Sequence, residues 1–186
     1  MDGKKRIVDL PKLTSKRLMY RAIESEDFPA VTELLADHDV VQYDLGYTVS
    51  SMTEATYFIE RLIANHPFNW AVFERATNHF IGLTGFRHLD RLSHQSEIGA
   101  LLAKVYWKQG YGQEMLTTIM DFGFHTLSLN RLYARVIEEN APANRILQRN
   151  DFKLEGTLRK AIFQKERYSN INLYAMLKEE YEAPSK

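Results

Sequence analysis

The chain has 186 residues, enough for one domain with a sizeable hydrophobic core. Basic and acidic residues number 24 each and 45% of the residues are hydrophobic, which argues against intrinsic disorder and gives no electrostatic case for nucleic-acid binding. The lack of cysteine excludes disulfides, thiolate catalysis and cysteine-ligated metals, and it fits the reducing cytoplasm.

The two ends of the chain differ from its middle. Residues 1–15 are expected to form a loose N-terminal segment and residues 179–186 a charged C-terminal tail, around a domain at 16–178. The basic start is not followed by the apolar stretch of a secretory signal. No apolar run approaches the roughly 20 residues of a membrane-spanning helix, so we expect a cytoplasmic protein without a membrane partner.

The first third of the chain alternates between strand and helix signals. Residues 16–23 predict a strand, and Ser25 then precedes apolar residues at helical spacing, with Pro29 in the first turn of the helix. Ser51 and Glu54 have the spacing of a capping box, which predicts a helix over 52–65. Its predicted apolar face consists of Ala55, Phe58, Ile59, Leu62 and Ile63.

Three strands are predicted next. Residues 68–76 and 80–88 are expected to form a hairpin through Thr77–His79. Residues 95–103 are apolar on both faces, which is typical of a central strand. Gly99 inside that strand predicts a bulge or a close backbone approach.

The remaining elements complete a mixed fold. A long helix with a broad apolar face is predicted over 111–127, then a strand over 131–138 and a short helix after Asn140. Residues 152–177 predict two strands around a charged turn near Lys165 and Glu166. We therefore expect a single α/β (α+β) domain with a mixed, mostly antiparallel sheet and flanking helices.

The segment between the central strand and the long helix, Trp107–Gly112, is a candidate anion site. A strand, a glycine-bearing loop and a helix N-terminus together point several main-chain N–H groups and the positive end of the helix dipole at one place. The loop lacks the Gly-Lys-Ser/Thr of a nucleotide-binding P-loop. The alternative is a tight turn that only opens the helix.

Several segments in a fixed order resemble the GNAT superfamily of acyl-coenzyme A-dependent N-acetyltransferases, and most closely its RimJ/RimL branch. The resemblance covers roughly residues 16–178. Its motifs are Lys16-Arg17-Leu18, Glu97-Ile98-Gly99, Tyr106 to Gly112, Leu129 to Val136, Glu139-Asn140 with Arg145 to Phe152, Glu155 to Arg159, and Arg167-Tyr168 with Leu173-Tyr174.

The resemblance implies acetyl-CoA as co-substrate, bound where the central strand splays from its neighbour. The implied cofactor residues are Leu101 and Leu102 on the strand, Lys108, Gln109, Gly110, Tyr111, Gly112 and Gln113 at the loop and helix, and Asn140. Each has an ordinary structural role as its alternative. Asn140, for instance, is also suited to cap the helix that follows it.

Glu97 is the candidate catalytic base, because it lies on the central strand near the place that the resemblance implies for the thioester. Its alternatives are a solvated carboxylate and an ion-pair partner for Arg135. Tyr168 and Tyr174 are candidate general acids or plain sheet aromatics. Ala143 and Asn170 stand where relatives often carry a serine and an acidic residue.

The predicted activity is therefore direct transfer of an acetyl group from acetyl-CoA to a primary amine, most simply a protein N-terminal amine. The alternatives are a small amine such as a polyamine or aminoglycoside, and a non-catalytic coenzyme A-binding sensor. The acceptor pocket is expected between 37–50 and the final strands, with Tyr43, Asp44, Tyr47 and Phe163. No metal and no direct nucleic-acid partner are expected, and a homodimer stays open.

Overall fold

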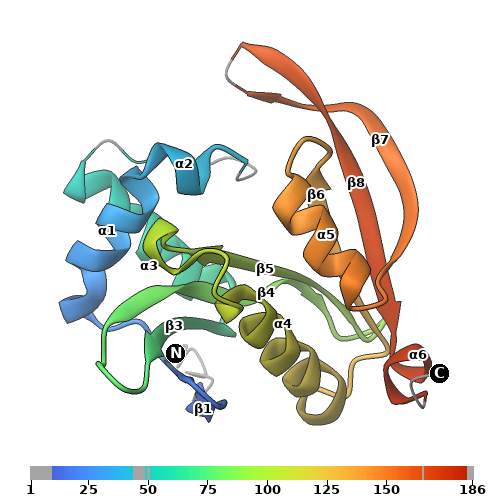
Figure 1. Cartoon of the computed structure of the whole chain (residues 1–186), viewed down its shortest axis with the longest axis horizontal. Helices are drawn as coiled ribbons and strands as arrows, with labels where there is room; N and C mark the ends of the chain where they lie inside the picture. Colours follow the sequence, from blue (N-terminus) through green and yellow to red (C-terminus); the bar gives the residue numbers. More distant parts are fainter. Residues whose placement is uncertain (1–9, 44–48, 50, 165, 184–186) are drawn as a thin grey trace, which may run out of the picture.

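The computed structural model describes residues 10–43, 49, 51–164 and 166–183, and these form one twisted sheet with helices on both faces (Figure 1). The described strands have the order β1-β2-β3-β4-β5-β6-β8-β7. Their bounds are β1 Leu13–Thr14, β2 Leu18–Arg21, β3 Asn69–Glu74, β4 Phe80–Asp90, β5 Gln95–Leu102, β6 Arg131–Ile137, β7 Lys153–Gln164 and β8 Arg167–Leu177.

Every neighbouring pair of described strands is antiparallel except β5 and β6, which are parallel. The α-helices are α1 Phe28–Ala36, α2 His38–Val41, α3 Met52–Asn65, α4 Tyr111–Asp121, α5 Ala141–Arg149 and α6 Lys178–Glu182. Short 3₁₀ segments are η1 Ser25–Asp27 and η2 Lys104–Tyr106, and η3 Phe122–Thr126 is a π-helical turn that continues α4. The predicted mixed, mostly antiparallel fold is confirmed.

Two hydrophobic cores lie on opposite faces of the sheet. One joins α1 and α3 to Ala71, Phe73 and Leu83 of the sheet. The other joins α4 and α5 to Trp70, Phe86 and their neighbours. Because alternate residues of β3 enter different cores, the continuous apolar character of this strand follows from burial on both sides.

The helix predicted over 52–65 has these bounds in the structure, and the Ser51 side chain accepts a hydrogen bond from the Glu54 N–H at its start. Its predicted apolar face is wrong at Ile63, which is 44% exposed. The expectation for Gly99 is also wrong. The register through Gly99 is regular, and a Cβ there would have only ordinary contact with Arg87. Close approaches occur instead at Gly82, where a Cβ would lie 2.1 Å from the Leu101 carbonyl oxygen, and at Gly85, where it would lie 2.3 Å from the Phe68 carbonyl oxygen.

Both ends of the described chain carry structure beyond the predicted domain limits. β1 lies within the segment expected to be loose and pairs with β2. α6 begins at Lys178, and Tyr181 stacks on Phe124 with ring centroids 4.9 Å apart. Among the described residues, none of the helices has the length and apolar character needed to cross a membrane.

Candidate functional site

The central feature of the site is a wedge between β5 and β6. The two strands pair only from Gln95 to Glu97, opposite Arg131 to Tyr133. Beyond that point β6 pairs with β8 and β5 pairs with β4, so their facing edges have no partner strand among the described residues. Ala100, in the middle of a central strand, is exposed for this reason. The splayed strand pair that the resemblance implied is present.

Three observations identify the main-chain groups that face the wedge. Ala103 N–H donates to the Ile81 carbonyl, the Gly99 carbonyl accepts from Thr84 Oγ1, and the Leu101 carbonyl lies against Gly82. Residues 99, 101 and 103 therefore direct their polar groups at β4. Since main-chain groups alternate along a strand, those of residues 98, 100 and 102 face the wedge.

Leu101 and Leu102 were both predicted to bind the cofactor, but this alternation directs their main-chain groups to opposite edges of β5. Leu102 has its main-chain groups on the wedge edge, whereas those of Leu101 face β4. The Leu102 carbonyl also accepts a hydrogen bond from Trp107 Nε1 at 2.7 Å. The indole thus ties the loop after η2 to the end of β5, and the free edge of the wedge runs from residue 98 to the Leu102 N–H.

The loop ahead of α4 is shaped by two residues with left-handed backbone conformations. Lys108 has φ 59° and Gly110 has φ 82°, and α4 begins directly after Gly110. The first intrahelical bond runs from Glu114 N–H to the Gly110 carbonyl. The N–H groups of the preceding turn, through Gln113, have no intrahelical acceptor and point out of the helix N-terminus. This arrangement fits the predicted anion site.

Arg17, which lies between β1 and β2, holds the loop before α4 in place. Its Nη1 donates to the Gln109 carbonyl at 2.9 Å, its Nε contacts Glu114 Oε2 at 2.8 Å, and its guanidinium lies 4.1 Å from the centre of the Tyr111 ring. Glu114 also accepts from Ser15 Oγ and from the Arg17 N–H. Burial opposes the charge of Glu114, but these hydrogen bonds outweigh it and lower the pKa of the carboxyl.

Other predicted cofactor residues use their side chains locally. Tyr111 donates its hydroxyl to Glu74, a bond that raises the pKa of the tyrosine. Gln109 Nε2 donates to the Val105 carbonyl, and the amide of Gln113 pairs reciprocally with that of Asn150 on α5. Their main-chain N–H groups, rather than these side chains, are available to an anion.

Asn140 is the N-cap of α5, where its Oδ1 accepts from the Ala143 N–H at 3.2 Å. The capping alternative is therefore observed. The Asn140 carbonyl accepts from the buried Asn144 amide at 2.7 Å, so the start of α5 is held from two directions.

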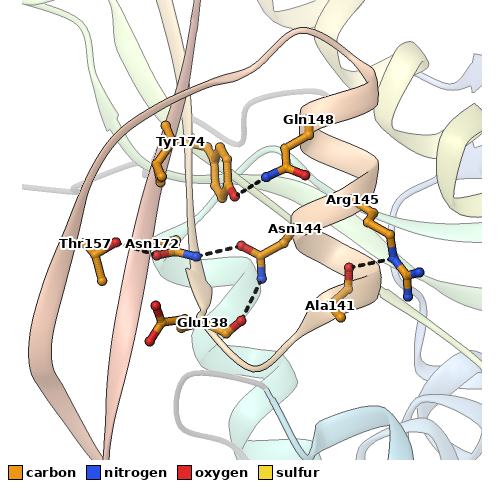
Figure 2. Close-up of a pocket in the computed structure, with 9 residues that line it drawn as sticks. Glu138, Ala141, Asn144, Arg145, Gln148, Thr157, Asn172 and Tyr174 are labelled. Atoms are coloured by element: carbon orange, nitrogen blue, oxygen red, sulfur yellow. Dashed lines mark hydrogen bonds between the residues drawn. The ribbon is translucent and has the colours of Figure 1, made fainter.

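A cavity of about 510 Å³ lies away from the wedge, between α5 and β7–β8 (Figure 2). The polar side chains that line it form a chain of hydrogen bonds. The Thr157 hydroxyl donates to Asn172, the Asn172 amide donates to Asn144, and the Asn144 amide donates to main-chain carbonyls. Gln148 Nε2 donates to the hydroxyl of Tyr174, which is buried in the sheet. The α5 residues lining this cavity lie on the flank opposite Ile146, which faces Gly112 of α4.

Glu97, the predicted base, is 3% exposed and lies at the closed end of the wedge. Its Oε2 contacts Arg135 Nη2 at 3.0 Å and Nε at 3.1 Å, and His88 Nε2 lies 3.8 Å away. The ion-pair alternative is thus also observed. No hydrogen bond from a described residue reaches Oε1. Burial and the charge of Glu97 raise the pKa of neighbouring Tyr133.

Of the predicted acceptor-pocket residues, Tyr43 and Phe163 are described, while Asp44 and Tyr47 lie outside the described residues. Phe163 is on the β7–β8 hairpin beside exposed Tyr168. On the other side, Asp39 of α2 pairs with Lys104 of η2 at 2.5 Å, which lowers the pKa of the aspartate.

Sequence reasoning missed the supporting residues Glu114, Glu74 and Asn144. Ser15 and Arg17 lie almost a hundred residues before their partner Glu114, and no local pattern signals that contact. Asn144 carried a weak signal, because a polar residue one turn after an N-cap is suited to bind the cap's carbonyl.

The comparisons with known proteins concern nearly the whole chain. Residues 17–153 match the Acetyltransferase (GNAT) domain family. An uncharacterized N-acetyltransferase of Bacillus subtilis is 28% identical over 172 residues, covering 90% of this chain and 97% of its own. A spermidine N(1)-acetyltransferase of Vibrio cholerae is 22% identical over 90% of this chain and 96% of its own. The ribosomal-protein-serine acetyltransferase of Escherichia coli is 30% identical over 52% of this chain and 54% of its own.

Solved structures share the fold. A GNAT-family acetyltransferase from Bacillus anthracis superimposes with a TM-score of 0.82 at 25% identity, covering 91% of this chain and 99% of its own. The RimL ribosomal L7/L12 α-N-protein acetyltransferase in complex with coenzyme A gives a TM-score of 0.81 at 22% identity, over 90% of this chain and 98% of its own.

Proposed function

The chain belongs to the GNAT acetyltransferase family, and from that premise we propose that it acetylates the α-amine of a polypeptide N-terminus. It is an acetyl-CoA-dependent acyltransferase, with acetyl-CoA as co-substrate. The observation that carries the proposed site is the unpaired edge of β5, which leads directly to the loop and N-terminus of α4.

The wedge edge and the loop bind different parts of acetyl-CoA. The main-chain groups of Ala100 and the N–H of Leu102 are placed to pair with the amides of the pantetheine arm, as an added strand would. The N–H groups from Gly110 to Gln113 are placed to receive the pyrophosphate at the positive end of α4. Asn140 marks the other wall of the wedge, at the start of α5.

Glu97 is placed to orient the acceptor and to take its proton. Arg135 holds one carboxylate oxygen, and this leaves Oε1 to accept from an ammonium or from a water between them. The neutral amine then attacks the thioester carbonyl carbon and a C–N bond forms. The C–S bond breaks, and the departing thiolate takes the second proton of the amine, directly or through water, to leave as the thiol of coenzyme A. No cysteine exists to carry the acetyl group, so the transfer is direct.

An N-terminal amine suits this site better than a lysine or a polyamine. Its pKa near ~8, against ~10.4 for lysine, leaves more of it neutral at cellular pH and asks less of an ion-paired base. The E. coli relative named for ribosomal-protein acetylation supports this choice. Spermidine is the competing acceptor because of the V. cholerae relative, but Asp39, a second carboxylate that could hold another of its ammonium groups, is already paired with Lys104.

The test compares two peptides with purified protein and acetyl-CoA. One has a free N-terminus and no lysine, and the other is blocked at its N-terminus and carries lysine. We expect mass spectrometry to find acetyl groups on the first peptide at a higher rate. Acetylation confined to the blocked peptide, or to added spermidine, would remove the proposed acceptor and leave the family assignment in place.

A further inference from the structure

The hairpin of β7 and β8 extends well beyond the rest of the sheet. β6 ends at Ile137 opposite Ile171, and farther out β8 pairs with β7 alone, through Ile162 with Ser169 and Phe163 with Tyr168. We call residues 159–164 and 166–170 the distal ribbon. The seven residues from Leu158 to Gln164 span at most about 20 Å, and Figure 1 shows the hairpin projecting from the body of the protein.

The distal ribbon has the surface chemistry of a binding element. Phe163 and Tyr168 are 61% and 63% exposed, with ring centroids 4.9 Å apart. Arg159, Lys160 and Arg167 are exposed as well, and none of the ion pairs among the described residues includes them. Glu166 is the acidic residue of the ribbon, which therefore carries a net positive charge. Exposed aromatic and arginine side chains are those that most often anchor protein interfaces.

The ribbon begins at the open end of the wedge. β5 and β6 run parallel and separate toward their C-terminal ends, and the ribbon continues outward from the end of β6. The Glu138 N–H donates to the Asn170 carbonyl at this junction, and the Asn170 side chain donates to Glu138 Oε2. A polypeptide with its N-terminal amine at Glu97 would leave the wedge through this open end, where the ribbon begins.

We propose that the distal ribbon binds the acceptor polypeptide behind its N-terminus and selects acceptors with an acidic segment there. This rests on the proposed N-terminal acetylation. The cations attract carboxylates and raise the encounter rate, the aromatic pair supplies apolar contact, and the outer edge of β7 offers main-chain groups to an extended chain. The same cations repel a polyamine.

An acidic polypeptide fits the ribbon better than nucleic acid does. The chain as a whole has a net charge of zero, and the ribbon presents three described cations. Nucleic-acid binding typically rests on six or more phosphate contacts and on a basic surface.

The test uses three lysine-free peptides with the same four N-terminal residues. The following eight residues are rich in aspartate and glutamate, neutral, or rich in arginine. We expect kcat/KM to be about tenfold higher for the acidic than for the neutral peptide and lowest for the basic one. The difference in kcat/KM between the acidic and the neutral peptide should shrink as the salt concentration rises from about 20 mM to 0.5 M, because salt screens contacts between exposed charges.

Charge reversal tests the ribbon itself. The triple variant Arg159→Glu, Lys160→Glu, Arg167→Glu should invert the preference toward the basic peptide, and the single variant Arg167→Gln should reduce the acidic preference without inverting it. Arg91→Glu, an exposed charge change at the β4–β5 turn, is the matched control and should leave the order unchanged.

Equal rates for the three peptides with wild type, or an order that neither ribbon variant changes, would overturn the proposal while N-terminal acetylation stands. Wild type that acetylates spermidine and none of the peptides would overturn both. A labelled RNA oligonucleotide bound by wild type and released by the triple variant, with peptide rates unaffected, would assign the ribbon to nucleic acid and also overturn it.

Discussion

Replacement of Arg17 by glutamine tests whether the loop before α4 is a preformed pyrophosphate site. The change removes the hydrogen bond to the Gln109 carbonyl, the ion pair with Glu114 and the contact with the Tyr111 ring. Because the Arg17 side chain is 38% exposed, each contact is taken at about 0.5–1 kcal/mol, near the lower end of its range. The three together give about 2 kcal/mol, or roughly 4–8 °C in Tm for a chain of this size.

The effect on catalysis should depend on the donor. Without Arg17 the Gln109–Gly110 turn loses its support, and we expect kcat/KM for acetyl-CoA to fall on the order of tenfold, about 1.4 kcal/mol. S-acetylpantetheine has the same thioester and amides but no pyrophosphate, so its kcat/KM should stay within about twofold of wild type. Both donors are assayed with one peptide acceptor, below the melting range of each variant.

Arg75→Gln is the matched control, because Arg75 Nη1 donates to the Ser15 carbonyl of the same segment at 3.0 Å without touching the loop. It should lower Tm and leave the donor preference unchanged. An equal fall for both donors in Arg17→Gln would refute the reasoning, since it would show general damage to the enzyme rather than the loss of a pyrophosphate site.

Three further predictions follow from the site and the sheet. Glu97→Gln should lower kcat/KM by about 10²-fold with coenzyme A affinity retained in calorimetry, and an unchanged pH–rate profile would exclude Glu97 as the base. Gly82→Ala should lower Tm, since its Cβ would lie 2.1 Å from the Leu101 carbonyl, whereas Gly156→Ala, with nothing within 4 Å, should not; equal Tm values would contradict the close approach. The lowered pKa of Glu114 means that its stabilisation is present above the ordinary value of 4.5 and is lost as the pH falls through the folded-state value. Glu114→Gln should therefore flatten the fall of Tm in acid, and a parallel acid limb in wild type and variant would contradict this.

The sequence predicted the order and type of nearly every element because its signals are local. The helix over 52–65 follows from a cap and an apolar face within one segment, and the hairpin through Thr77–His79 follows from turn residues between two apolar runs. The wedge itself was implied by the family resemblance rather than by any local pattern.

The errors lie where tertiary contacts decide. The sequence cannot tell which of Leu101 and Leu102 turns its main-chain groups to the wedge, because that depends on the register with β4. A bulge or close backbone approach was predicted at Gly99, whereas the close approaches are at Gly82 and Gly85. β1 extends the sheet into a segment expected to be loose, since its partner strand β2 and the Trp70 bond to the Pro11 carbonyl hold that segment in place.

Some features of the candidate site were predicted from the sequence, and others became visible only in the fold. Glu97 and Asn140 were predicted with two roles each, and the structural role of each is present, as the partner of Arg135 and as the cap of α5. Their roles in catalysis and cofactor binding stay predictions. The contacts of Arg17 with Glu114 and Gln109 join segments far apart in sequence, so only the fold reveals them.

The most direct test of the central claim is a competition in one tube. Purified protein and acetyl-CoA are given equal concentrations of a lysine-free peptide with a free N-terminus, an N-terminally blocked lysine peptide and spermidine, and the acetylated products are followed over time by mass spectrometry. The account predicts that the N-terminal α-amine of the first peptide is acetylated first, with coenzyme A released in equal amount. Acetylspermidine or acetyl-lysine as the sole product would contradict it.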